Sequence, residues 1–246
     1  MTESSSTTPG SPSPAAPGDS AYFDAFPDLF DRFTRIWDGI NGSVDDWILR
    51  NLPEHVDRAI DLGCGAGRHS VLLADRAEHV VAVDVAERML DIARTERARP
   101  NVDYRHRGIL DVTAEDGPFD VALSVHALHH VGDPGVVLPH VRSLLAPGGR
   151  LVVADIIDPG GWRTREFHLD RAFDNARLVY QLTSDGDAAA DVVRLLLHPR
   201  WLQLTDADTP LTRDAFHAAY DDAFPGVVYA EGLNPIMCGA VWQAPS

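Results

Sequence analysis

The stretch that decides the fold is Arg58-Ala-Ile-Asp-Leu-Gly-Cys-Gly-Ala-Gly-Arg-His-Ser70, followed further on by Val80-Val-Ala-Val-Asp84. The apolar segment 59–62 predicts a short buried strand, and the glycines that follow predict a turn with almost no side chain. A ligand can therefore lie directly on the backbone of this turn. A helix over 70–77 and a second parallel strand over 80–83 complete a strand–turn–helix–strand unit, with the early N–H groups of the helix directed at the turn.

Several nucleoside cofactors could use such a unit. Asp84 ends the second strand 21 positions after Gly63, an offset at which a carboxylate can accept from both hydroxyls of a ribose. A dinucleotide fingerprint would place its third glycine where the chain has Arg68, which weakens a nicotinamide or flavin interpretation. A phosphate-binding P-loop is excluded because the chain contains no lysine.

The loop from Asp61 to Gly67 closely resembles the nucleotide loop of class I S-adenosylmethionine-dependent methyltransferases. The resemblance implies that the loop wraps the amino-acid end of S-adenosylmethionine and that Asp84 holds the ribose. The family often places an aspartate directly after a glycine to accept from the adenine amine. Here Ile109 follows Gly108, so Asp111 is expected to take that role from a shifted position. The implied cofactor set is Asp61, Gly63, Gly65, Gly67, Asp84, Ile109, Leu110, Asp111 and Val125.

Three histidines follow the strand predicted over 119–125. The Leu-His-His ending of this segment is similar to that of small-molecule methyltransferases. A histidine that only fixes the loop is one interpretation, chiefly for His130. A general base is the other, for His129, His130 or His126, because a neutral imidazole accepts a proton near neutral pH. No metal is expected, since the neighbouring sequence supplies neither a carboxylate nor a cysteine partner.

Further features extend the resemblance over about 58–157. A helix capped by Asp133 and running to Leu145 is expected, then a Pro147-Gly148-Gly149 turn similar to a family signature, then a strand over 151–155. The segments 227–231 and 237–243 alternate like two paired strands. The predicted fold is therefore α/β, a doubly wound Rossmann-like sheet of seven strands with an antiparallel last strand.

The remaining segments suggest how the chain is divided. Residues 1–19 are predicted to be a disordered tail, because their Ser, Thr, Pro, Gly and Ala bury too little apolar surface to fold. Residues 20–246 are expected to form a single domain, with an N-terminal helical lid at 20–55, a cofactor-binding core at 56–157, a helical substrate insertion at 158–210 and the last helix and strand pair at 211–246. The candidate substrate residues are Tyr22, Phe23, Trp162, Glu166, His168 and Trp201.

Composition limits the partners. The net charge of −16 makes nucleic acid an unfavourable partner. No segment has the length of a membrane span or the pattern of a signal peptide, so a cytoplasmic protein, monomer or homodimer, is expected. The predicted function is methyl transfer from S-adenosylmethionine to oxygen, nitrogen or carbon of a small molecule, plausibly a secondary metabolite or quinone-like aromatic. The alternatives are a cyclase or isomerase that binds the cofactor without transfer, and a non-catalytic binding module.

Overall fold

The computed structural model describes residues 22–40, 42–160, 164–208, 210–234 and 236–246. Its centre is a seven-stranded sheet with the order β3-β2-β1-β4-β5-β7-β6. The strands are β1 (Val56–Leu62), β2 (Ala77–Asp84), β3 (Val102–His106), β4 (Phe119–Val125), β5 (Leu145–Ile156), β6 (Val228–Asn234) and β7 (Met237–Gln243).

The strand order indicates which edge of the sheet a ligand is expected to occupy. Strands β1 to β5 are mutually parallel, and the order reverses between β1 and β4. Strand β7 runs antiparallel to both β5 and β6. This is the doubly wound sheet with an antiparallel last strand that the sequence predicts. Ligands of such sheets bind at the carboxyl ends of the strands beside the reversal.

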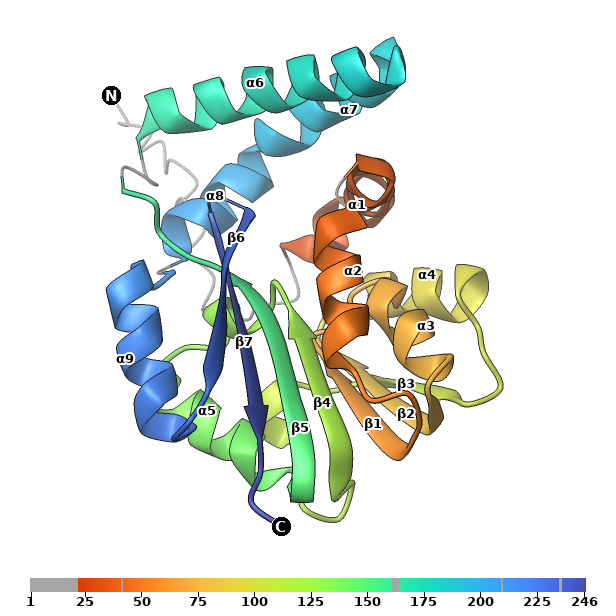
Figure 1. Ribbon diagram of the computed structural model, residues 1–246. Helices are drawn as coiled ribbons and strands as arrows, with labels where there is room; N and C mark the ends of the chain where they lie inside the picture. Colours follow the sequence, from red (N-terminus) through yellow and green to blue (C-terminus); the bar gives the residue numbers. More distant parts are fainter. Residues whose placement is uncertain (1–21, 41, 161–163, 209, 235) are drawn as a thin grey trace, which may run out of the picture.

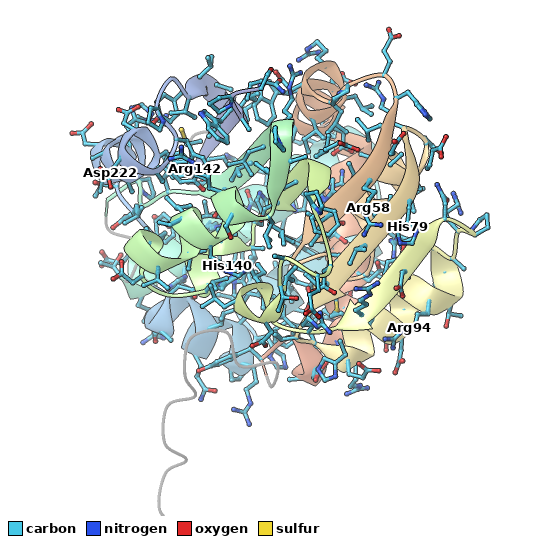
Figure 2. The ribbon with its side chains drawn as sticks, turned by 90° about the horizontal axis from the view of Figure 1, so that it is seen from below. Arg58, His79, Arg94, His140, Arg142 and Asp222 are labelled. Carbon is cyan, nitrogen blue, oxygen red and sulfur yellow. The ribbon has the colours of Figure 1, made fainter. Side chains whose placement is uncertain are left out.

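Helices cover both faces of the sheet (Figure 1). On one face lie α2 (Gly42–Asn51), α3 (Arg68–Ala74) and α4 (Glu87–Glu96); on the other lie α5 (Pro134–Ser143) and α9 (Arg213–Ala223). Ile48 of α2 and Leu73 of α3 pack on Val80 and Leu123, whereas Val141 of α5 and Phe224 pack on the opposite side with Phe119. Arg142, labelled in Figure 2, joins the second layer. It donates to the Ala223 carbonyl and lies over the Trp242 ring.

A third group of helices lies beyond the carboxyl ends of the strands (Figure 1). It contains the short 3-10 helix η1 (Phe23–Ala25), α1 (Pro27–Ile40), α6 (Arg165–Thr183), α7 (Gly186–Leu196) and α8 (Pro199–Ala207). Ala172, Val179, Val192 and Leu196 form an apolar cluster separate from the sheet core, and Trp37 of α1 packs against it. The N-terminal segment and the insertion after β5 therefore share one small core above the sheet.

Several predicted boundaries were wrong by a few residues. The helix expected over 70–77 ends at Ala74, because Ala77 already pairs with Val56 as the start of β2. The helix expected to reach Leu145 ends at Ser143, since Leu145 pairs with Phe119 in the sheet. β5 thus extends through the Pro147-Gly148-Gly149 segment and ends at Ile156, rather than covering 151–155 alone. The tail at 1–19 lies outside the described residues, and among those described no helix is long and apolar enough to cross a membrane.

Candidate functional site

The glycine loop after β1 is built for close backbone approach. Gly63, Gly65 and Gly67 all have positive φ, at 77°, 51° and 80°, a conformation that glycine adopts without the strain that other residues incur. A Cβ on Gly63 would lie 2.3 Å from Cβ of Ala127, and one on Gly67 would lie 2.5 Å from the Tyr104 hydroxyl. At Gly65 the nearest heavy atom would be Cε of Met89, 3.6 Å away. Of the three, Gly65 therefore leaves the most room for a ligand on the backbone.

Two carboxylates flank this loop. Asp84, at the end of β2, accepts from the Gly65 N–H at 2.7 Å and from the Ala86 N–H at 2.8 Å. Asp61, on β1, is 2% exposed and accepts from the Ser70 hydroxyl at 2.6 Å. Burial raises the pKa of Asp61 to about 6, against the lowering effects of His69 and Ser70, and burial also raises the pKa of Asp84. Burial destabilises the ionised form of both carboxyl groups. A nearby positive charge would stabilise that form, so the site favours a cationic ligand.

The predicted adenine side lies on η2 (Ile109–Asp111). Ile109 is buried, and its Cδ1 would be 3.9 Å from a Cβ on Gly63, so it packs over the loop. Leu110 and Asp111 are exposed. Val125 ends β4, where it pairs with Ala154. The structure thus brings Ile109 to the loop, while the adenine roles of Leu110 and Asp111 stay predictions.

The histidines after β4 lie at the carboxyl edge of the sheet. The backbone of His126 is left-handed, with φ of 56°, and its ring Nε2 lies 3.2 Å from Sδ of Met237. The enclosing protein desolvates this ring and lowers its pKa to about 3, so the imidazole is neutral at neutral pH. His129 and His130 stand on η3 (Leu128–His130) with ring centroids 3.8 Å apart.

Each of these two rings has its own carboxylate. His129 Nδ1 lies 2.6 Å from Asp155 Oδ1, and His130 Nδ1 lies 2.8 Å from Asp208 Oδ1. Burial alone would lower the pKa of His129, but the Asp155 carboxylate outweighs it and raises that pKa, while His129 in turn lowers the pKa of Asp155. Burial and the charge of His129 lower the pKa of His130. The two neighbouring rings therefore have pKa values shifted in opposite directions, upward for His129 beside Asp155 and downward for His130.

The N-terminal segment bridges the loop and the histidines. Phe23 packs against the apolar cluster of Ala66, Ala86 and Met89, and its ring lies edge to face with that of His130 at 5.6 Å. Asp24 accepts from the Arg88 N–H at 3.0 Å, which fixes η1 to the start of α4. Tyr22 is buried beside Phe23, at 4% exposure. The N-terminal segment thus contacts both the loop cluster and the histidine segment, while its role as a lid stays a prediction.

Arg97 connects the lid helix to the loop. Its guanidinium pairs with Asp31 of α1 at 2.7 Å and donates to the Ala66 carbonyl at 3.0 Å. The Arg97 side chain therefore links α1 to the glycine loop.

The other predicted substrate residues are more scattered. Trp201 packs against Phe26, Phe30 and Phe33, so it belongs to the aromatic contact between α1 and α8. Glu166 is exposed at the start of α6, whereas His168 is buried and its Nε2 has no hydrogen-bond partner among the residues that the structure describes. Trp162 lies outside the described residues. Contact of any of these residues with a substrate stays a prediction.

The sequence analysis did not select Asp155 and Asp208. Asp155 had a recognisable signal, because Val152-Val-Ala-Asp155 repeats the apolar run and terminal aspartate of Val81-Ala-Val-Asp84 on another strand of the same sheet. Asp208 had none, since it follows a helix 78 residues beyond its partner His130.

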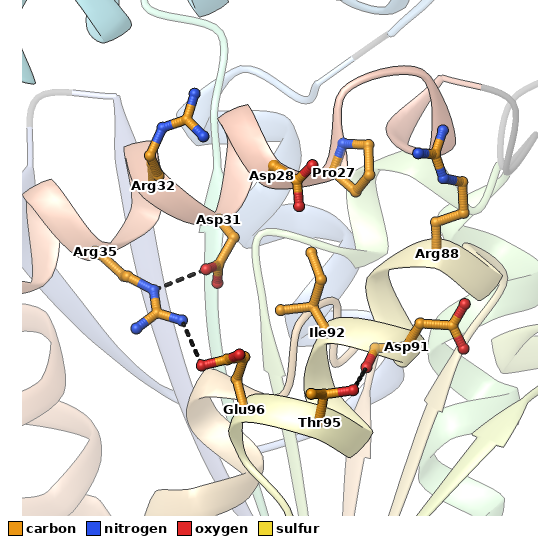
Figure 3. A pocket seen from close by; sticks show the side chains of 10 residues that line it. All are labelled: Pro27, Asp28, Asp31, Arg32, Arg35, Arg88, Asp91, Ile92, Thr95 and Glu96. Atoms are coloured by element: carbon orange, nitrogen blue, oxygen red, sulfur yellow. Dashed lines mark hydrogen bonds and ion pairs between the residues drawn. The ribbon is translucent and has the colours of Figure 1, made fainter.

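A groove of about 630 Å³ between α1 and α4 is not this site (Figure 3). Its lining includes Arg35, which pairs with Asp31 at 2.7 Å and with Glu96 at 3.9 Å. None of its lining residues belongs to the glycine loop or the histidine segment. Figure 3 shows Arg35 directed at Asp31 on its own helix and at Glu96 of α4.

The fold and site together define a class of protein. A sheet of order β3-β2-β1-β4-β5-β7-β6, a bare glycine loop after β1 and a carboxylate ending β2 are the features of the class I methyltransferase fold. Residues 60–153 match a family model described as a methyltransferase domain. Over residues 60–153 the chain is thus similar to a methyltransferase domain in sequence, and its sheet has the fold of solved S-adenosylmethionine-dependent methyltransferases.

Known proteins resemble the chain over different lengths. The ubiquinone biosynthesis O-methyltransferase of Xylella fastidiosa (strain 9a5c) is 39% identical over 114 residues, which are 45% of this chain and 46% of that protein. The chain thus matches about half the length of this relative. A DhpI–SAH complex is similar in fold with a TM-score of 0.63 and 17% identity, over 92% of this chain and 96% of that one. An S-adenosylmethionine-dependent methyltransferase from Mesorhizobium loti has a TM-score of 0.53 and 20% identity, over 80% and 95% of the two chains.

Proposed function

We propose that this protein transfers a methyl group from S-adenosylmethionine to an oxygen atom of a small molecule, and that the acceptor is a quinone-like aromatic or a related secondary metabolite. The observation that carries the proposal is the loop of Gly63, Gly65 and Gly67 between the carboxylates of Asp61 and Asp84. The choice of oxygen and of a quinone-like acceptor is supported by the relatives of the core, which are ubiquinone biosynthesis O-methyltransferases.

The residues around the loop fit the cofactor. Asp84 already directs its carboxylate at the loop, and a carboxylate has lone pairs beyond the two that the Gly65 and Ala86 amides use. These lone pairs suit the two hydroxyls of a ribose. Asp61 is buried and accepts from the neutral Ser70 hydroxyl, so its carboxylate suits the ammonium group of the methionine end.

The proposed acceptor side lies beside the N-terminal segment. Phe23 packs against the apolar cluster that contains the loop residue Ala66 and also contacts the His130 ring, so an acceptor near Phe23 would lie close to both the proposed cofactor and the imidazoles. S-adenosylmethionine supplies an electrophilic methyl group, so the protein has mainly to align the acceptor and exclude water. A ring such as Phe23 offers an apolar face to an aromatic acceptor.

A hydroxyl acceptor has to lose its proton. Asp155 fixes the orientation of His129, and within the described residues no hydrogen bond engages His129 Nε2. This nitrogen can accept the proton itself or hold an ion that lowers the pKa of the hydroxyl. His129 is therefore the residue that we assign to proton removal, and the alternative role of His126 is disfavoured by its low pKa.

Methyl transfer is tested with labelled cofactor and a panel of acceptors. The panel contains catechols, hydroxyquinones, amines and carboxylates, and the readouts are labelled product and S-adenosylhomocysteine. The expected result is labelled product from phenolic or hydroxyquinone acceptors, lost in Asp84→Ala and retained in Asp91→Ala, which removes an exposed carboxylate of α4. Binding of the cofactor with rearranged but unmethylated product would support a cyclase or isomerase instead. Failure to bind any adenosyl ligand would support a non-catalytic module.

A further inference from the structure

Two histidines and an aspartate come together beneath the lid. One ligand atom from each of His129, His130 and Asp208 lies within 4.8 Å of the other two. Their side chains are 8%, 16% and 5% exposed, so the cluster is largely enclosed. Imidazole nitrogens and a carboxylate oxygen at such separations form a donor set that suits a transition-metal ion.

The surroundings of His129 are those of a metal ligand. Its Nδ1 lies 2.6 Å from Asp155 Oδ1, and its backbone N–H donates to Asp155 Oδ2 at 3.0 Å. Metal-binding histidines usually donate one ring N–H to a carboxylate, which fixes the tautomer and directs the other nitrogen at the ion. Asp155, which is 3% exposed at the end of β5, provides this outer contact.

The three candidate ligands come from separate parts of the fold. His129 and His130 belong to η3 after β4, whereas Asp208 caps the end of α8 in the insertion. A second group with suitable donors, His55, Asp57 and Glu78, is fully exposed near the opposite ends of β1 and β2. Because that second group is exposed on the surface, a variant of it serves as the control in the metal-binding experiment below.

We propose that His129, His130 and Asp208 bind one divalent transition-metal ion, with Zn²⁺ or Fe²⁺ as the favoured type. Three protein ligands leave at least one coordination position open. If the proposed function also holds, an acceptor hydroxyl would take this position and lose its proton at neutral pH, as hydroxyls do when bound to such ions. His129 would then act as a ligand rather than as the base.

Metal binding is measured directly, without reference to methyl transfer. The full chain, free of any histidine tag and stripped with chelator, is titrated with Zn²⁺ by calorimetry and with Co²⁺ by visible absorption. One high-affinity site and a Co²⁺ spectrum of low coordination number are expected. Asp208→Asn keeps the size of the side chain and is expected to weaken Zn²⁺ binding by roughly 100-fold or more, as is His130→Gln. Asp155→Asn is expected to weaken it by about 10–100-fold through the orientation of His129.

His55→Asn is the matched control and is expected to leave binding unchanged. Thermal unfolding of each variant in chelator shows whether it is folded. The proposal is overturned if the wild-type protein gives only the spectrum of aqueous Co²⁺, if folded Asp208→Asn binds Zn²⁺ as tightly as wild type, or if His55→Asn removes the site. Calorimetry with S-adenosylhomocysteine on the same samples tests the cofactor site separately, so failure of one proposal is distinguishable from failure of the other.

Discussion

Cofactor affinity should depend on pH through Asp61. This carboxyl group is 2% exposed, and burial raises its pKa to about 6 in the ligand-free protein. A cationic ammonium beside it favours the ionised form, so binding below that pKa must release a proton. Affinity is therefore lost as pH falls through about 6. At about pH 5 roughly one-tenth of Asp61 is ionised, so binding should be ~10-fold weaker than at about pH 7, or ~1.4 kcal/mol.

The assay is calorimetric titration with S-adenosylhomocysteine in several buffers of different ionisation enthalpy. These buffers report proton release as well as affinity, and about one proton should be released per ligand at about pH 5. Asp61→Asn can still accept from the Ser70 hydroxyl, so the loop is expected to keep its structure. This variant should bind weakly at all pH values, without the pH dependence. Equal wild-type affinity at about pH 5 and about pH 7, with no proton released, would refute the electrostatic role assigned to Asp61.

Three other changes test separate parts of the site. Asp84→Ala should weaken binding of S-adenosylhomocysteine by about 1–3 kcal/mol, because charged hydrogen bonds are lost; calorimetry measures this, and an unchanged Kd would count against the ribose assignment. Gly63→Ala would place a Cβ 2.3 Å from Cβ of Ala127 at a φ of 77°. Urea unfolding should therefore show a free energy of unfolding lower by roughly 2–4 kcal/mol. The control Gly186→Ala, in open space at the start of α7, should change this free energy by less than ~1 kcal/mol. Phe23→Ala should lower kcat/KM for the acceptor about tenfold and leave the Kd of S-adenosylhomocysteine within about threefold; a larger effect on cofactor than on acceptor would reassign Phe23 to the cofactor.

The cofactor half of the site could be predicted from sequence because its determinants are local. The segment 59–62 is apolar except for Asp61, the glycines follow at once, and Asp84 ends the next apolar run, so strand, loop and carboxylate are all marked by neighbouring residues. The start of β2 was not predicted, because the local sequence there does not mark a strand. Its Glu78 and His79 are polar, and only pairing with β1 shows that they belong to the strand.

The acceptor half could not be predicted because its contacts join distant segments. His130 meets Asp208 across 78 residues, and Phe23 reaches the same ring from the N-terminal segment. The expectation of no metal rested on the absence of a nearby carboxylate in the sequence. The fold brings Asp155 and Asp208 to these histidines, so that argument no longer holds. The contacts of Trp201 are also non-local, because it packs against Phe30 and Phe33 of α1, and its contact with a substrate stays a prediction.

The central claim is that the glycine loop and Asp84 bind an adenosyl cofactor. Calorimetry of the purified full chain with S-adenosylhomocysteine, repeated in the presence of a nicotinamide dinucleotide as competitor, tests this claim most directly. One bound S-adenosylhomocysteine per chain, unaffected by the dinucleotide and weakened in Asp84→Ala, is the predicted result. Absence of adenosyl binding together with tight dinucleotide binding that depends on Asp84 would contradict the account.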